Sequence, residues 1–148
     1  MKPTGFTIIE LLIVVVILGV LASLAIPRLS SASVNAKYTA THAGFRSITA
    51  ALDVYHTDHQ AYPPNAPLDK LPPEMVGYLH DSAFTEPPPI GRAWDWNGTG
   101  SGINTFGINL SIHTTPRSDR DEMEKRYDDG DPKTGTYRNQ GMYLIWPM

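Results

Sequence analysis

Cysteine is absent from this 148-residue chain. The chain therefore forms no disulfide bond and offers neither a thiolate metal ligand nor a thiol nucleophile. Charged residues are also scarce, at 18%, and the formal net charge of −3 gives no electrostatic basis for binding nucleic acid. At this length we expect one globular core beside any further segment, not two independent cores.

Familiar catalytic motifs are absent as well. The sequence has no Gly-x-Ser-x-Gly turn, no His-Glu-x-x-His pair and no phosphate-binding loop. His56 and His59 are three residues apart and could share a metal ion, but no third ligand is evident, so a solvated helix end is the preferred interpretation. We therefore expect a structural protein and not an enzyme.

One long hydrophobic run is present, from Phe6 to Ile26, and Glu10 is its only ionisable residue. As a helix this run would be roughly 31 Å long, close to the hydrocarbon thickness of a bilayer. It is longer than the apolar part of a cleavable secretion signal, which has about 7–15 residues. An acid in a membrane segment is costly unless it is paired, so Glu10 is a candidate functional residue.

The stretch Gly5-Phe6-Thr7-Ile8-Ile9-Glu10 and the run after it resemble the prepilin signal of type IV pilins and of type II secretion pseudopilins. The resemblance implies that a prepilin peptidase cuts after Gly5 and that the new terminal residue, Phe6, is N-methylated. It also implies that Glu10 pairs with the terminal ammonium of Phe6, in its own or a neighbouring subunit, and so fixes the register of a filament. A plain signal anchor with an incidental glutamate is the alternative.

A second apolar pattern follows Pro27, with the helical spacing that marks one buried face. It comprises Tyr38, Phe45, Ile48, Leu52 and Tyr55. The residues expected mostly on the other face are Thr39, Thr41, Arg46, Thr49 and Asp53. We predict one helix from about Phe6 to about His59, with its second half lying on a sheet. Gly19 and Pro27 interrupt it, and we expect a kink near Pro27; the alternative is that Pro27 ends a first helix.

The end of this helix also carries the resemblance. The run Ala51-Leu52-Asp53-Val54-Tyr55, then Asp58, then Tyr62-Pro63 resembles the major pseudopilins, in which the tyrosine-proline closes the helix. The resemblance divides the chain into a leader peptide, a transmembrane and assembly helix, an amphipathic half of the same helix, and a globular β-rich domain. These segments are residues 1–5, 6–27, 28–60 and 61–148.

The β-rich domain begins with turn-forming sequence. A short helix is expected over Pro72–Leu79, with Met75, Tyr78 and Leu79 facing the domain, because proline and an acid suit the first turn. The prolines 87–89 are interpreted as a stiff connection into the sheet, with a polyproline ligand as the less favoured alternative.

Three strands are expected next, over Ala93–Trp96, Phe106–Ile112 and Met142–Trp146. Asn97-Gly98 is a hairpin signal. Strict alternation should place four residues on one buried face, namely Phe106, Ile108, Leu110 and Ile112. Trp94 and Trp96 could bind a sugar or a peptide, but core packing is the preferred interpretation.

An exposed helix is expected over Ser118–Tyr127, with Ser118 and Asp121 as a capping box and Met123 and Tyr127 as an apolar edge. The turn that follows holds Asp128, Asp129 and Asp131 around Gly130. Major pseudopilins resemble this in having an acidic C-terminal loop that binds calcium, which needs six or more oxygen ligands. The spacing is not that of an EF-hand, so these aspartates are only weak calcium candidates and a simple acidic turn is preferred; no other cofactor is expected.

The resemblance implies an α+β, pilin-like fold and a structural role as a pseudopilin of a type II secretion-type system. The implied partners are sister pseudopilins in a helical filament, the prepilin peptidase, an inner-membrane platform protein and a cytoplasmic ATPase. The chain would be a single-pass protein of the bacterial inner membrane, with its globular domain in the periplasm. The alternatives are a type IV pilin of a surface fibre, for which the missing disulfide is unfavourable, and a minor capping subunit, which lacks the acid at the position of Glu10.

Overall fold

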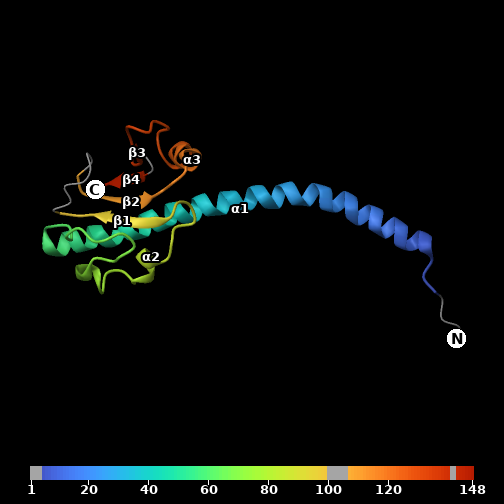
Figure 1. The fold of residues 1–148 in the computed structure, drawn as a ribbon, viewed down its shortest axis with the longest axis horizontal. Coiled ribbons are helices and arrows are strands. Elements are labelled where there is room, and N and C mark those ends of the chain that lie inside the picture. The colour runs from blue at the N-terminus through green and yellow to red at the C-terminus, as the bar shows by residue number, and fades with distance from the viewer. Residues whose placement is uncertain (1–4, 100–106, 141–142) are drawn as a thin grey trace. The chain divides into compact units, whose positions relative to one another are not determined.

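The structure is a computed structural model that describes residues 5–99, 107–140 and 143–148. It separates into two compact units, Met1–Ala36 and Lys37–Met148. The first helix, α1 (Ile8–His59), runs through the division, so Pro27 does not end it. The expected α+β class is confirmed, because the second half of α1 packs on a small antiparallel sheet (Figure 1).

The second half of α1 presents the predicted apolar stripe to the sheet. All five stripe residues are buried, and Phe45 and Leu52 are wholly inaccessible to solvent. The prediction that Thr41 and Thr49 lie on the solvent side is wrong, since both are buried. Their hydroxyl groups donate to backbone carbonyls one turn earlier, at 2.9 Å and 2.8 Å, so a buried threonine costs little here.

The sheet has the strand order β1-β2-β4-β3, and all neighbouring strands are antiparallel. The strands are β1 (Ala93–Asn97), β2 (Asn109–His113), β3 (Arg138–Gln140) and β4 (Tyr143–Pro147). β1 and β2 correspond to two predicted strands and β4 to the third. β3 was not predicted. Phe106 and Met142, which begin two of the predicted strands, lie outside the described residues.

One face of the sheet is aromatic and packs on α1. Trp94 pairs across the strands with Ile112, and Trp96 pairs with Leu110. The Trp94 ring meets the Phe45 ring edge-on, with the centroids 5.0 Å apart. The two tryptophans are therefore core residues, as the sequence favoured.

The opposite face of β2 is also buried, which strict alternation did not predict. Asn109 and Ser111 are 0% and 1% exposed. The side-chain amide of Asn97 donates to both of them, at 3.3 Å and 3.4 Å. The polar face is thus satisfied by side-chain hydrogen bonds.

The connection between β1 and β2 is not the tight hairpin that Asn97-Gly98 suggested, because Asn97 pairs with Asn109. Gly98 has a different role. A Cβ atom at Gly98 would lie 2.2 Å from the carbonyl oxygen of Pro63. The glycine allows the chain leaving α1 to lie against β1, where the Trp96 indole N–H donates to the carbonyl of Pro64 at 3.1 Å.

The region between α1 and the sheet departs from the prediction in two places. The helix expected over Pro72–Leu79 is only a three-residue 3-10 turn, Pro73–Met75. Gly77 has a φ of 101°, which a helix cannot accommodate. A short helix, α2 (Ser82–Thr85), was not predicted. Met75 is fully buried, and Tyr78 and Leu79 pack against the core, as expected.

The last helix, α3 (Arg117–Tyr127), begins one residue before the predicted start. Its N-cap is Pro116, so the predicted capping box of Ser118 and Asp121 is wrong. The helix is also less exposed than predicted, since three of its residues are buried: Arg120, Met123 and Glu124.

Candidate functional site

The bond between Gly5 and Phe6 lies before α1, and both residues are exposed. A Cβ atom at Gly5 would meet nothing within 4 Å, and the φ of Gly5 is not in the left-handed region. Among the described residues, no packing contact therefore requires glycine at this position. A requirement for glycine here would come from another molecule that recognises this segment.

The first turn of α1 contains a contact that the sequence interpretation missed. The backbone N–H of Thr7 donates to Glu10 Oε2 at 2.8 Å, and the Thr7 hydroxyl donates to the same oxygen at 2.6 Å. In return, the Glu10 N–H donates to Thr7 Oγ1 at 3.3 Å. This is a capping box, and the Thr-x-x-Glu spacing could have revealed it. Thr7 therefore fixes the direction of the Glu10 carboxylate.

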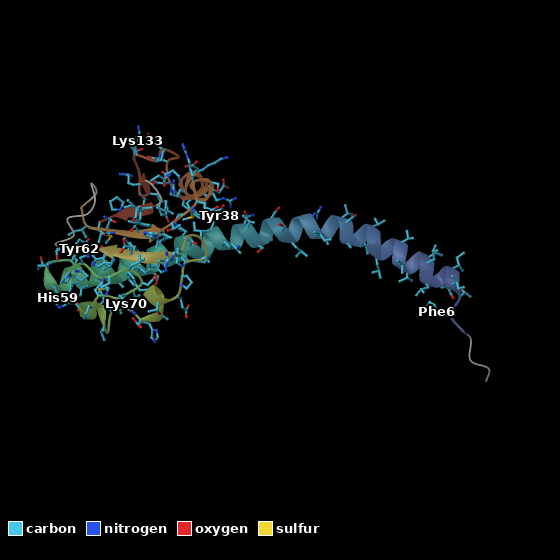
Figure 2. The ribbon with its side chains drawn as sticks, viewed as in Figure 1. Phe6, Tyr38, His59, Tyr62, Lys70 and Lys133 are labelled. Atoms are coloured by element: carbon cyan, nitrogen blue, oxygen red, sulfur yellow. The ribbon has the colours of Figure 1, made fainter. Side chains whose placement is uncertain are left out.

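The part of α1 that follows is apolar on all sides and exposed (Figure 2). Leu12 is 59% exposed and Leu21 is 58% exposed. The helix is long and apolar enough to cross a membrane, with a mean hydropathy of 2.9 in its most apolar window. Such a surface is stable only in lipid or against other apolar helices.

The second candidate site is a group of carboxylates at the end of α3. Single oxygens of Glu124, Asp128 and Asp129 all lie within 4.8 Å of one another. The sequence named Asp128 and Asp129 but missed Glu124, because a charged residue on a helix is expected at the surface. Asp131 lies outside this group and accepts the backbone N–H of Lys133 at 3.0 Å.

The carboxylate of Asp128 accepts a backbone hydrogen bond and lies close to the backbone of Gly135. It accepts the backbone N–H of Tyr137 at 2.5 Å. A Cβ atom at Gly135 would lie 2.3 Å from one of its oxygens, and the φ of Gly135 is 73°, so glycine is needed there. The contact joins two stretches of sequence that are nine residues apart.

Glu124 differs from its neighbours because it is buried. The residue is 1% exposed, and its carboxylate accepts no hydrogen bond from a donor group of the described residues. In its protonated form it can share a hydrogen bond with the carboxylate of Asp129. Burial, with the charges of Asp128 and Asp129, raises the pKa of Glu124 to about 8. The pKa of Asp129 is lowered, chiefly by the hydrogen bond from the backbone of Asp131. A cation at Glu124 would take the place of the proton that the group otherwise keeps.

The two histidines at the end of α1 each stack on a tyrosine. The His56 ring lies 4.4 Å from Tyr62, and the His59 ring lies 4.1 Å from Tyr55, measured between centroids. His59 Nδ1 is also 3.1 Å from the carbonyl oxygen of Tyr55. These contacts favour the interpretation of a helix end over a shared metal ion. His59 and Tyr62 are labelled at that end of α1 in Figure 2.

The N-terminal segment is shared with known proteins. Residues 1–26 match the family model described as "Prokaryotic N-terminal methylation motif". The chain therefore carries a prepilin-type methylation motif at its N-terminal end.

Among curated proteins, the chain is similar to "Type II secretion system core protein G". The protein of that name from Pseudomonas aeruginosa is 48% identical over 62 residues, which are 42% of this chain and 44% of the relative. The protein from Vibrio cholerae is 40% identical over 62 residues, 42% of each chain. The protein from Klebsiella michiganensis is 33% identical over 91 residues, 57% of this chain and 64% of the relative.

The similarity is concentrated at the N-terminal end. The match covers less than half the length of the relatives from Pseudomonas aeruginosa and Vibrio cholerae. No solved structure matches the chain. The resemblance seen in the sequence is thus confirmed for the N-terminal segment, with the secretion proteins as the similar group.

Proposed function

We propose that this chain is a pseudopilin, a structural filament subunit of a type II secretion-type system. The observation that carries the proposal is the N-terminal segment itself. An exposed Gly5–Phe6 bond precedes Glu10, whose carboxylate Thr7 holds at the start of the apolar half of α1. The name of the similar proteins favours secretion over a surface pilus. The role is assembly and not catalysis.

In the proposed mechanism, a prepilin peptidase cuts after Gly5 and methylates the new amine of Phe6. The processed subunit waits in the inner membrane with its globular unit in the periplasm. A platform protein and a cytoplasmic ATPase then draw it into a periplasmic filament with sister subunits. The apolar surface of α1 leaves lipid and packs on other α1 helices. Glu10 meets the ammonium of a neighbouring Phe6 and sets the axial register, because neither charge is stable alone in that environment.

Filament assembly tests this function directly. In cells that carry the secretion machinery, we expect Glu10→Val to remain in the membrane but to form no filaments. Glu74→Val is a matched control, because Glu74 is exposed and lies in the globular unit. Normal filaments from Glu10→Val would contradict the register mechanism, and equal loss in both variants would point to a general effect of removing a charge.

We also propose that calcium binds at the group of three carboxylates at the end of α3. In this group Glu124 takes the place of Asp131, which the sequence had suggested as a ligand. Glu124, Asp128 and Asp129 are the donors, and carboxylate oxygens are the ligands that Ca²⁺ prefers. A cation at this position is supported by Glu124, whose buried carboxylate accepts no hydrogen bond from a donor group of the described residues. Asp131 is assigned to the turn and not to the ion.

Thermal unfolding of the full chain in detergent tests the calcium site. Calcium should raise the midpoint relative to EDTA, by mass action on the folded state. Glu124→Gln should abolish that rise, whereas Asp131→Asn should keep it. A rise of equal size in the Glu124→Gln variant would exclude this donor set.

A further inference from the structure

A small hollow lies between the first two turns of α3 and the loop that leads into β3. Its volume is about 200 Å³, which suits one head group and not an extended ligand. The residues that line it are Arg117, Arg120, Asp121, Pro132, Lys133 and Asn139. Figure 2 labels Lys133 on that loop. Three of the six carry positive charge and one carries negative charge.

Arg120 is the deepest of the cations. It is 8% exposed, and one of its Nη atoms donates to the carbonyl oxygen of Thr115. Its Nε–H is buried without a hydrogen-bond partner, and no carboxylate of the described residues lies within 4 Å of it. A buried, unpaired charge is costly, so an anion beside Arg120 would stabilise the folded chain.

The acid on α3 that is best placed to pair with Arg120 does not do so. Glu124 lies one turn further along α3, at the spacing that favours an ion pair. Its carboxylate instead faces Asp128 and Asp129. Glu124 therefore does not neutralise the buried charge of Arg120.

Asn139 supplies a second unpaired group in the same hollow. Both polar atoms of its side-chain amide are buried without a partner among the described residues. Arg120 and Asn139 both line the hollow, and each has a buried N–H group without a partner among the described residues. A planar group with two acceptor oxygens could accept from both.

The charges around the hollow define the class of anion. Arg117, Arg120 and Lys133 together attract negative charge, and the N-terminus of α3 adds to this field. Asp121 lies on the same rim, 3.7 Å from Arg117 in an exposed pair. Its carboxylate would repel a dianion more strongly than a monoanion.

We propose that this hollow binds a carboxylate group, with Arg120 and Asn139 as the direct donors and with Lys133 and Arg117 providing attraction from the rim. The carboxylate is either a free small anion or the side chain of a neighbouring protein molecule. Both sources share the same recognition chemistry. The site is independent of the N-terminal segment and of the calcium proposal.

The test uses the full chain in detergent micelles, with sodium acetate as the probe at constant ionic strength. The Asn139 side-chain amide resonance should shift and saturate as acetate replaces chloride. Inorganic phosphate at the same ionic strength should bind more weakly. No saturable shift with acetate, or tighter binding of phosphate, would overturn the proposal.

A matched pair of variants separates the site from general electrostatics. Lys133→Gln should weaken acetate binding about two- to five-fold, the size expected for one exposed charge. Lys70→Gln makes the same charge change at an exposed residue that is not on α3 and does not line the hollow, and it should leave binding unchanged. Equal weakening by both variants would overturn the proposal, and Lys133 avoids the risk that a buried Arg120 variant fails to fold.

Protein concentration distinguishes the two sources of the carboxylate. If a second copy supplies it, the Asn139 resonance should shift with protein concentration in the absence of acetate, and acetate should reverse that shift. If the anion is free, the resonance should respond to acetate alone. Either pattern supports a carboxylate site, and a resonance that responds to neither contradicts it.

Discussion

Glu10 is held by its own chain before any partner reaches it. The Thr7 hydroxyl and backbone N–H both donate to one Glu10 oxygen, so the other oxygen is left for a second charge. The side chain is thereby oriented at the start of α1, so the proposed pairing with a neighbouring ammonium would lose less conformational entropy. This gives Thr7 a supporting role that the sequence interpretation did not assign.

Thr7→Val should loosen the first turn of α1. The variant keeps the bulk of the side chain but loses the hydroxyl, and such a cap contributes about 0.5–2 kcal/mol. We expect faster hydrogen exchange of the Glu10 amide, which donates to the Thr7 hydroxyl, in micelles, and fewer filaments. Thr7→Ser retains the hydroxyl and should behave like the unmodified chain. Equal protection in both variants would show that the capping contact has no effect.

His42 lies among aromatic rings on the buried side of α1. Its ring stacks on Tyr127, with centroids 4.2 Å apart, and its Nδ1 is 2.8 Å from the Tyr137 hydroxyl. Burial, and to a lesser degree the charge of Arg46, lower the pKa of His42 from its ordinary value of 6.5. The folded chain therefore resists a proton that the unfolded chain accepts.

The stability contribution of His42 should depend on pH. It is complete above the unfolded pKa of about 6.5 and is lost as the pH falls below that value. Urea unfolding should show a free energy of unfolding that falls between about pH 7 and pH 5, and falls less in His42→Gln. The same slope in both proteins would mean that His42 is not responsible.

At the scale of elements, the packing of α1 on the sheet depends on a glycine. A Cβ atom at Gly44 would lie 2.9 Å and 3.1 Å from two atoms of the Trp94 ring. The large ring can approach the helix backbone only because this position has no side chain. The contact explains why a residue that is unfavourable in a helix occurs in the middle of α1.

Gly44→Ala should destabilise the globular unit. Overpacking costs about 1–3 kcal/mol, and the better helix propensity of alanine returns about 1 kcal/mol. We expect a net loss of about 1 kcal/mol by denaturant unfolding. Gly19→Ala is the same substitution on the same helix with nothing within 4 Å, and it should cause no loss. A stabilised Gly44→Ala variant would contradict the packing described.

The sequence predicted the elements whose hydrophobic pattern is long enough to show a period. The stripe on α1 repeats over several turns, so its burial was predicted residue by residue. β3 and α2 have three and four residues, too few to show a period. Burial of charge on α3 could not be predicted, because Arg120 and Glu124 are polar and their environment comes from distant segments.

At the scale of the whole molecule, the two units are stable for different reasons. The buried apolar residues of the described chain all lie at or after Tyr38. The large apolar residues that the structure describes between Phe6 and Val34 are exposed instead. The second unit thus holds the core, whereas the first depends on lipid or on other helices.

Removal of residues 1–36 should therefore leave a folded protein. We expect the shortened chain to be soluble, with an unfolding midpoint within a few degrees of the full chain, since no core residue is lost. Circular dichroism in aqueous buffer would measure this. Aggregation or a broad transition would show that the second unit needs the first.

The account as a whole depends on processing at Gly5, and intact mass tests it most directly. The full chain would be purified after co-expression with a prepilin peptidase and, separately, without it. We predict that the peptidase removes Met1–Gly5 and that one methyl group is added to Phe6, whereas the chain is uncut without the enzyme. An uncut chain in both samples, or a cut near Ala25 or Ala32, would contradict the filament function and indicate an anchored or secreted domain.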